Sequence, residues 1–249
     1  MNGIDVSRYQ GKIDWDKVKS AGVEFAMLKT VSTNKKFGGI YIDPEFERNY
    51  SECKRLGIPV GAYYYTYAQD MDYANAEISK FKEAVSGKIF EMPLVVDVED
   101  NLLRPLTAEV LTNLVCYALD VIESWGCYAM VYTYTNYKNT ELDFTRLAAY
   151  DLWIADYRGV KPVICGMWQS TSKGRIDGIA GNVDLNTAYK NYPEIIKKHG
   201  LYKIVQTVKL YTAEIGPMTK GDELSVYELA DRLGIAYKIV KEEDFDGNE

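Results

Sequence analysis

From residue 2 to about residue 190, short apolar runs alternate with stretches in which apolar residues have helical spacing. The runs predict eight strands: GIDVS (3–7), EFAMLKT (24–30), IPVGAYYYTY (58–67), PLVVDVE (93–99), CYAMVYTY (127–134), DLWIADY (151–157), ICGMWQS (164–170) and GNVDLN (181–186). Several are continuously apolar, as expected of parallel strands buried on both faces. Eight strands with short helices between them predict an α/β fold, an irregular (β/α)8-type (TIM-like) barrel.

The stretches between the strands carry signals for helix starts and stops. Asp14, Asp43 and Thr107 are candidate N-caps, and Pro44 would occupy the first helical position after Asp43. Glycines end the predicted helices, at Gly22, Gly57, Gly126 and Gly200. Clear helical periodicity is missing between the fifth and eighth strands, which is why we expect an irregular barrel. Residues 187–200 predict a closing helix.

The pattern changes after residue 200. YKIVQTVKLYTAEIG (202–216) alternates like a strand or hairpin, Ser225 can cap a helix over VYELADRL, and IAYKIV (235–240) reads as a last strand. We therefore predict two domains, a barrel of residues 1–195 and a small β-α-β module of residues 201–249.

Composition excludes several classes of partner. The net charge of −7 and the absence of a basic run argue against nucleic acid. No apolar run approaches the ~20 residues that cross a membrane, and MNGIDVSRYQG lacks the features of a signal peptide.

Tyrosine stands out, with 21 residues against 7 Phe and 4 Trp. Most tyrosines would serve packing, and a minority would line a site for a ligand with flat faces, such as a sugar.

Cysteine and histidine usage restricts the chemistry. The four cysteines are widely spaced, without a C-x-x-C pair or a neighbouring histidine, so we expect no metal site and no cofactor. The single histidine, His199, lies at a predicted helix end, and we expect it to interact with that terminus rather than with a nucleophile. Catalysis should therefore depend on carboxylates.

Four carboxylates fall where predicted strands end: Asp5, Asp97, Glu99 and Asp184. Barrel enzymes carry their chemistry at the carboxyl ends of the strands. Asp97 and Glu99 are two residues apart and should share a strand face, whereas Asp100 should point elsewhere. Strands one and eight adjoin in a closed barrel, which would bring Asp5 beside Asp184.

Such clustering separates carboxylate pKa values and keeps one acid protonated near neutrality, as glycoside hydrolysis requires. The strand rise separates the Asp97 and Glu99 Cα atoms by roughly 6.6 Å, between the usual retaining and inverting spacings. Two alternatives remain for this pair, a Mg²⁺ or Ca²⁺ site and an ion pair with Lys29 or Arg104.

The segments GIDVSRYQGKIDW, GAYYYTY, PLVVDVE, YTY, LWIADY and MWQSTSKGRIDGIAGNVDLN together resemble glycoside hydrolase family 25, over about residues 2–190. The resemblance implies an N-acetylmuramidase that cleaves the β-1,4 bond between N-acetylmuramic acid and N-acetylglucosamine in bacterial peptidoglycan. It makes Glu99 the general acid, Asp97 its catalytic partner, and Asp5 and Asp184 the flanking acids.

The same resemblance places aromatic and polar side chains along a substrate groove: Tyr63, Tyr65, Tyr132, Trp153, Tyr157 and Gln169. The "YYY" at 63–65 departs from the more familiar Tyr-His-Phe-like version, which leaves open which of the three face the groove. In the expected mechanism Glu99 protonates the bridging oxygen and the substrate's own N-acetyl group attacks, steadied by Asp97. A covalent bond to Asp97 is the rival.

A family 25 domain followed by a small module resembles phage endolysins, which act from the cytoplasm of the infected bacterium and reach the wall at lysis. The module of residues 201–249 would then bind the cell wall and could self-associate as a homo-oligomer; a structural extension capping the barrel is the alternative. Two other function classes stay open, a chitinase-like hydrolase and a non-catalytic sugar-binding barrel.

Overall fold

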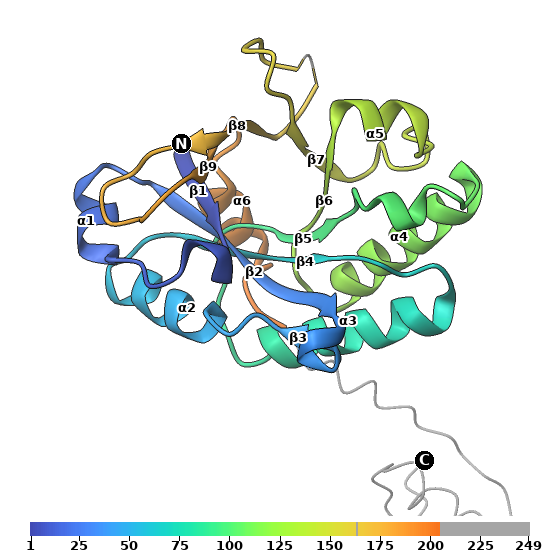
Figure 1. The fold of residues 1–249 in the computed structure, drawn as a ribbon, viewed down its shortest axis with the longest axis horizontal. Coiled ribbons are helices and arrows are strands. Elements are labelled where there is room, and N and C mark those ends of the chain that lie inside the picture. The colour runs from blue at the N-terminus through green and yellow to red at the C-terminus, as the bar shows by residue number, and fades with distance from the viewer. Residues whose placement is uncertain (163, 205–249) are drawn as a thin grey trace, which may run out of the picture. The chain divides into compact units, whose positions relative to one another are not determined.

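The computed structural model of the chain describes residues 1–162 and 164–204, so the predicted module of residues 201–249 lies almost entirely outside the described residues. In the described part, eight strands close into a barrel in the order β1-β9-β8-β7-β6-β5-β4-β2, with β1 returning to β2 and β3 added at the edge of β2 (Figure 1). The strands are β1 Asn2–Val6, β2 Phe25–Asn34, β3 Gly39–Ile42, β4 Val60–Tyr65, β5 Leu94–Asp97, β6 Ala129–Tyr134, β7 Asp151–Ala155, β8 Met167–Gly174 and β9 Val183–Ala188.

Strand direction breaks the expected repeat at one place. Neighbours from β1 through β2 and β4 to β8 are parallel, but β9 is antiparallel to both β8 and β1. Strands β8 and β9 therefore form a hairpin with no helix between them. The eight-stranded closed barrel is confirmed, whereas a (β/α)8 repeat running through its last strand is not observed.

Helices surround the strands (Figure 1). They are α1 Trp15–Ser20, α2 Phe46–Arg55, α3 Met71–Val85, α4 Ala108–Ser124, α5 Thr135–Thr140 and α6 Tyr192–His199, with 3-10 turns η1 Arg8–Gln10, η2 Lys35–Phe37 and η3 Asn101–Leu103. The predicted caps Asp14 and Thr107 are confirmed, since each accepts a hydrogen bond from a backbone N–H of its first turn. The predicted cap Asp43 is wrong: helix α2 begins at Phe46. The Asp43 carboxylate instead accepts hydrogen bonds from the backbone N–H groups of Glu45 and Arg8, both at 3.0 Å.

Two short elements escaped the sequence analysis. Strand β3 is only four residues long and forms a hairpin with the end of β2. Helix α5 has the polar sequence TNYKNT, in which only Tyr137 is buried, so it shows no apolar period.

The core has two layers. One lies between the strands and the surrounding helices, and the other fills the barrel with Phe25, Met27, Val95 and Met130, sealed by Tyr192 and Ile196 of α6. Glycine makes this inner packing possible, because a Cβ on Gly61 would lie 2.6 Å from the Met27 sulfur. The apolar filling occupies the end of the barrel where the parallel strands begin, which leaves their carboxyl ends for polar residues.

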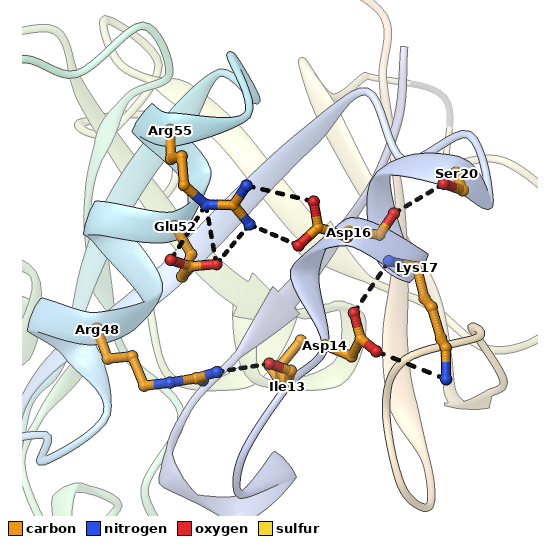
Figure 2. Close-up of polar contacts among 8 residues, drawn as sticks. All are labelled: Ile13, Asp14, Asp16, Lys17, Ser20, Arg48, Glu52 and Arg55. Atoms are coloured by element: carbon orange, nitrogen blue, oxygen red, sulfur yellow. Dashed lines mark hydrogen bonds and ion pairs between the residues drawn. The ribbon is translucent and has the colours of Figure 1, made fainter.

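Helices α1 and α2 are joined at the surface by a small polar network (Figure 2). Arg55 of α2 donates to Asp16 of α1 at 2.6 Å and to Glu52 of its own helix at 2.8 Å, and Arg48 donates to the carbonyl of Ile13 at 2.7 Å. Exposed ion pairs of this kind contribute little to stability. Their effect is to fix the first helix beside the second. No helix in the described residues is long and apolar enough to span a bilayer.

Candidate active site

The four acids predicted from the sequence meet in one cavity of about 370 Å³ at the mouth of the barrel. Asp5 lies near the carboxyl end of β1 and is the register partner of Asp184 in β9. The expected neighbourhood of the two is therefore confirmed, but one premise is wrong. Asp184 is near the beginning of β9, and it reaches the mouth because that strand runs antiparallel.

Asp97 and Glu99 approach the cavity from β5. Asp97 is the last residue of the strand, and Glu99 lies beyond its end, so the strand is shorter than the predicted 93–99. Both line the cavity, in agreement with a shared face. Asp100 does not line it. Its carboxylate instead accepts hydrogen bonds from the Tyr65 hydroxyl at 3.0 Å and the Leu102 N–H at 2.8 Å, so it holds a cavity tyrosine in place.

The electrostatics of this pair favour protonation. Burial raises the pKa of Asp97 well above its usual value, and the neighbouring Glu99 charge adds to the effect. Within the described residues, Asp97 Oδ1 is buried without a hydrogen-bond partner. Burial also raises the pKa of Glu99 to about 7, against the opposing charge of Lys29. Glu99 can therefore carry a proton near neutral pH and release it, as a general acid and base must.

The second pair is tied together by hydrogen bonds. Asp5 Oδ2 accepts from Gln169 Nε2 at 2.9 Å and from Asn186 Nδ2 at 2.8 Å. Burial and the adjacent Asp5 raise the pKa of Asp184 to about 8, and a side-chain hydrogen bond links the two carboxyl groups. The two carboxyl groups therefore retain a proton between them near neutral pH.

The six predicted groove residues all line the same cavity: Tyr63, Tyr65, Tyr132, Trp153, Tyr157 and Gln169. In the "YYY" segment Tyr63 and Tyr65 face inward, whereas Tyr64 is buried on the outer side against Phe81 of α3, at 5.0 Å between ring centroids. The side-chain oxygen of Gln169, Oε1, accepts hydrogen bonds from the hydroxyls of Tyr132 at 3.0 Å and Tyr157 at 2.5 Å. These bonds fix the Gln169 amide so that its N–H faces Asp5.

Sequence reasoning missed Asn186 and considered Lys29 only as an ion-pair partner. Lys29 of β2 also lines the cavity, with its ammonium 4.6 Å from the centre of the Tyr65 ring. No ion pair within 4.0 Å joins Lys29 to a carboxylate in the described part of the chain, and Arg104 pairs with Glu141 instead. Asn186 bridges Asp5 and the indole N–H of Trp153, at 2.8 Å. Lys29 occupies an inward position of a strand that is otherwise apolar on that face, with Phe25 and Met27, and Asn186 is two residues from Asp184 on the inward face of β9, so both signals are present in the sequence.

A second hollow of about 500 Å³ adjoins the first on the side of β6, α5 and β7. The two share Glu99, Tyr132 and Tyr157, and the second adds Asn139 and Arg158. Glu99 therefore stands where the two hollows meet. Among the described residues, no group of three or more His, Cys, Asp or Glu side chains is arranged to hold a metal ion.

The site has the features of a glycoside hydrolase: an acid with a pKa of about 7, a second carboxylate two residues away and a lining of aromatic rings, all in an α/β barrel. Comparison with known proteins identifies the family. Residues 4–179 match the model of "Glycosyl hydrolases family 25", and the chain belongs to that family. The family predicted from the sequence is thus confirmed, and with it the class of enzyme, a glycoside hydrolase of the lysozyme type.

Its relatives include proteins named as lysozymes and an autolysin. The autolytic lysozyme of Clostridium acetobutylicum is 31% identical over 189 residues, which cover 75% of this chain and 55% of that protein. The bacterial lysozyme of Streptomyces coelicolor is similar in structure, with 26% identity, a TM-score of 0.66 and coverage of 76% of this chain and 92% of the other. The modular autolysin LytC from Streptococcus pneumoniae, solved with a synthetic peptidoglycan ligand, is 26% identical with a TM-score of 0.65, over 76% and 46% of the two chains.

Proposed function

We propose that the chain is a peptidoglycan hydrolase that cleaves the β-1,4 bond between N-acetylmuramic acid and N-acetylglucosamine. The observation that carries the proposal is the Asp97–Glu99 pair, which lines one cavity together with Asp5 and Asp184. The names of the relatives and the peptidoglycan ligand of the pneumococcal autolysin support the same substrate.

Glu99 acts as the acid and then as the base. Protonated near neutral pH, it gives its proton to the bridging oxygen as the glycosidic bond breaks. The acetamido oxygen of the cleaved sugar bonds to the anomeric carbon, and Asp97 accepts a hydrogen bond from the acetamido N–H. Water then attacks the anomeric carbon, the bond from that carbon to the acetamido oxygen breaks, and the Glu99 carboxylate takes a proton from the water. The free Oδ1 of Asp97 suits that hydrogen bond, and it also suits direct attack on the sugar.

The position of Glu99 orients the substrate. Asp97, which accepts the hydrogen bond from the acetamido group of the cleaved sugar, lines the cavity of about 370 Å³, so this sugar occupies that cavity. The leaving sugar then lies in the hollow of about 500 Å³, on the other side of Glu99. The polar side chains Asn139 and Arg158 would contact it.

Digestion of purified peptidoglycan tests the reaction. The new reducing ends are reduced chemically and hydrolysed, and the resulting amino-sugar alcohol is identified. Muramic acid ends support the proposal and glucosamine ends would indicate a chitinase-like or glucosaminidase specificity. An absence of new ends would make the chain a non-catalytic sugar-binding barrel.

A second measurement separates the two mechanisms. A substrate whose acetamido group is replaced by a hydroxyl cannot use its own acetamido oxygen. Loss of its cleavage, with retained binding, supports the substrate-assisted route. Cleavage at a comparable rate would assign the nucleophile to Asp97.

We further propose that the enzyme is an endolysin, released to the wall when the infected cell lyses, and that residues 201–249 bind the wall and self-associate. Support comes from the sequence pattern alone. Sedimentation of the full-length Glu99→Gln protein with insoluble peptidoglycan, compared with a chain ending at residue 204, tests wall binding. Light scattering of the full chain tests self-association. Equal sedimentation of the two chains would favour the structural-extension alternative.

A further inference from the structure

An aromatic cluster beside the cavity has no part in the mechanism above. It consists of Tyr9, Phe37 and Tyr41 with Arg8 among them, and we call it the aromatic rim. Tyr9 is 72% exposed and Phe37 is 42% exposed. Tyr9 also lines the cavity that holds the four acids, so the rim is continuous with the catalytic pocket. Large exposed aromatic surfaces on a soluble protein commonly mark a binding site.

The rim is held in a fixed arrangement. The Arg8 guanidinium lies 4.2 Å from the Tyr9 ring centre and 5.2 Å from that of Phe37. It also donates hydrogen bonds to the hydroxyls of Tyr9 at 2.9 Å and Tyr41 at 3.2 Å. Phe37 stacks on Tyr41 with ring centres 4.4 Å apart. Buried Asp43 accepts a hydrogen bond from the Arg8 backbone N–H, which anchors the group.

A preformed surface of this kind has little side-chain freedom to lose when a ligand binds. The Arg8 guanidinium already contacts the hydroxyls of Tyr9 and Tyr41 and the rings of Tyr9 and Phe37. The surface that a ligand would meet is therefore mainly aromatic. Flat aromatic faces suit the apolar faces of pyranose rings, and the tyrosine hydroxyls suit their polar edges.

The order of strands in the barrel places the aromatic rim across the mouth from the hollow for the leaving sugar. Tyr9 follows β1, whereas the hollow for the leaving sugar lies by β6 and β7. Strand β6 is four strands from β1 in either direction around the closed barrel, so the two lie on opposite sides of the mouth (Figure 1). A glycan that passes from that hollow over Glu99 and through the acidic cavity therefore continues toward the rim.

Resting on the proposed muramidase function, we propose that the aromatic rim is an additional sugar subsite, which stacks a further pyranose unit on the non-reducing side of the cleaved sugar. The subsite would make the enzyme favour the interior of long glycan strands over short fragments. The exposed Lys35 and Lys36 beside Phe37 offer a different ligand, the acidic peptide stems of the wall, which the experiment distinguishes.

The test compares Phe37→Ala with a matched control, Tyr189→Ala. Tyr189 is 41% exposed and follows β9 at the opposite end of the barrel. The substrates are peptide-free glycan strands and a short fragment whose non-reducing terminal sugar occupies the acidic cavity, so that the fragment does not reach the aromatic rim. Phe37→Ala should lower the ratio of kcat/KM on long strands to that on the fragment by about tenfold, the size of a stacking contact. Phe37→Tyr should restore the ratio and Tyr189→Ala should leave it unchanged.

Binding to the Glu99→Gln protein, measured by calorimetry, separates this proposal from the proposed reaction. Weaker binding of peptide-free strands after Phe37→Ala supports the sugar subsite even if the wild-type chain cleaves nothing, an outcome that would reject only the muramidase function. Unchanged affinity would overturn the subsite. Weakening confined to peptide-bearing strands would overturn it as well, in favour of contacts with the peptide stem.

Discussion

Glu99→Gln should inactivate the enzyme and at the same time stabilise it above neutral pH. Glutamine keeps the shape of the side chain but cannot give a proton to the bridging oxygen. General acid catalysis typically contributes about 100- to 10,000-fold, and we expect a loss of that size in kcat. The gain in stability follows from the position of the carboxyl group in a buried cluster of acids.

The magnitude follows from the pKa of Glu99, which is raised from 4.5 to about 7 by burial. Below about pH 4.5 the group is protonated in both the folded and the unfolded chain and contributes no difference. Between these values the unfolded chain binds fewer protons than the folded one, so stability falls as pH rises. At about 1.4 kcal/mol for each pH unit the full penalty is about 3 kcal/mol. Partial exposure of the carboxylate reduces it to about 2 kcal/mol.

Urea unfolding of wild type and Glu99→Gln at about pH 4 and about pH 8 measures this difference, together with wall digestion near neutrality. The variant should match the wild type at the lower pH and exceed it at the higher one. Glu109→Gln is the control, because Glu109 is exposed in the first turn of α4. It should keep full activity. Equal stability of Glu99→Gln and wild type at the higher pH, or near-normal digestion by the variant, would refute the assignment of Glu99 as the buried proton donor.

Other predictions concern the surroundings of this acid. Lys29→Met removes the positive charge that lowers the Glu99 pKa, and Asp100→Asn removes a negative charge that raises it. The alkaline limit of the pH profile of kcat/KM should therefore move up in the first variant and down in the second; shifts in the same direction would contradict this account. Gly61→Ala places a Cβ 2.6 Å from the Met27 sulfur and should cost about 1–3 kcal/mol in urea unfolding, where a neutral result would show that the barrel interior can adjust.

Periodicity was sufficient to pair two of the four acids. Because residues two apart share a face of an extended chain, Asp97 and Glu99 can be paired from the sequence, and both line one cavity although Glu99 lies just beyond the end of β5. Inward-facing Tyr63 and Tyr65 obey the same rule, which also sends Tyr64 outward. The sequence fragments typical of the family then supplied the link to the remaining strands.

Strand direction could not be predicted in the same way. The apolar pattern of GNVDLN is the same for a parallel and an antiparallel strand, so the sequence predicts Asp184 at a strand end although it lies near the start of β9. The role of Lys29 could not be predicted for a different reason. A lysine in a strand beside acids suggests an ion pair, whereas the Lys29 ammonium lies near the Tyr65 ring and influences several acids without an ion pair to any of them in the described residues.

The pairing of β1 with β9 has a consequence for how the enzyme acquires activity as it folds. Asp5 and Asn186, which share a hydrogen bond, are 181 residues apart in the chain. Contacts between residues so distant in the sequence form late, because bringing them together costs the conformational entropy of the long intervening chain. Helices α3 and α4 can form from local contacts long before the barrel closes. In a refolding experiment, ellipticity should therefore recover ahead of wall-digesting activity, and the lag between the two would time the closure of the barrel.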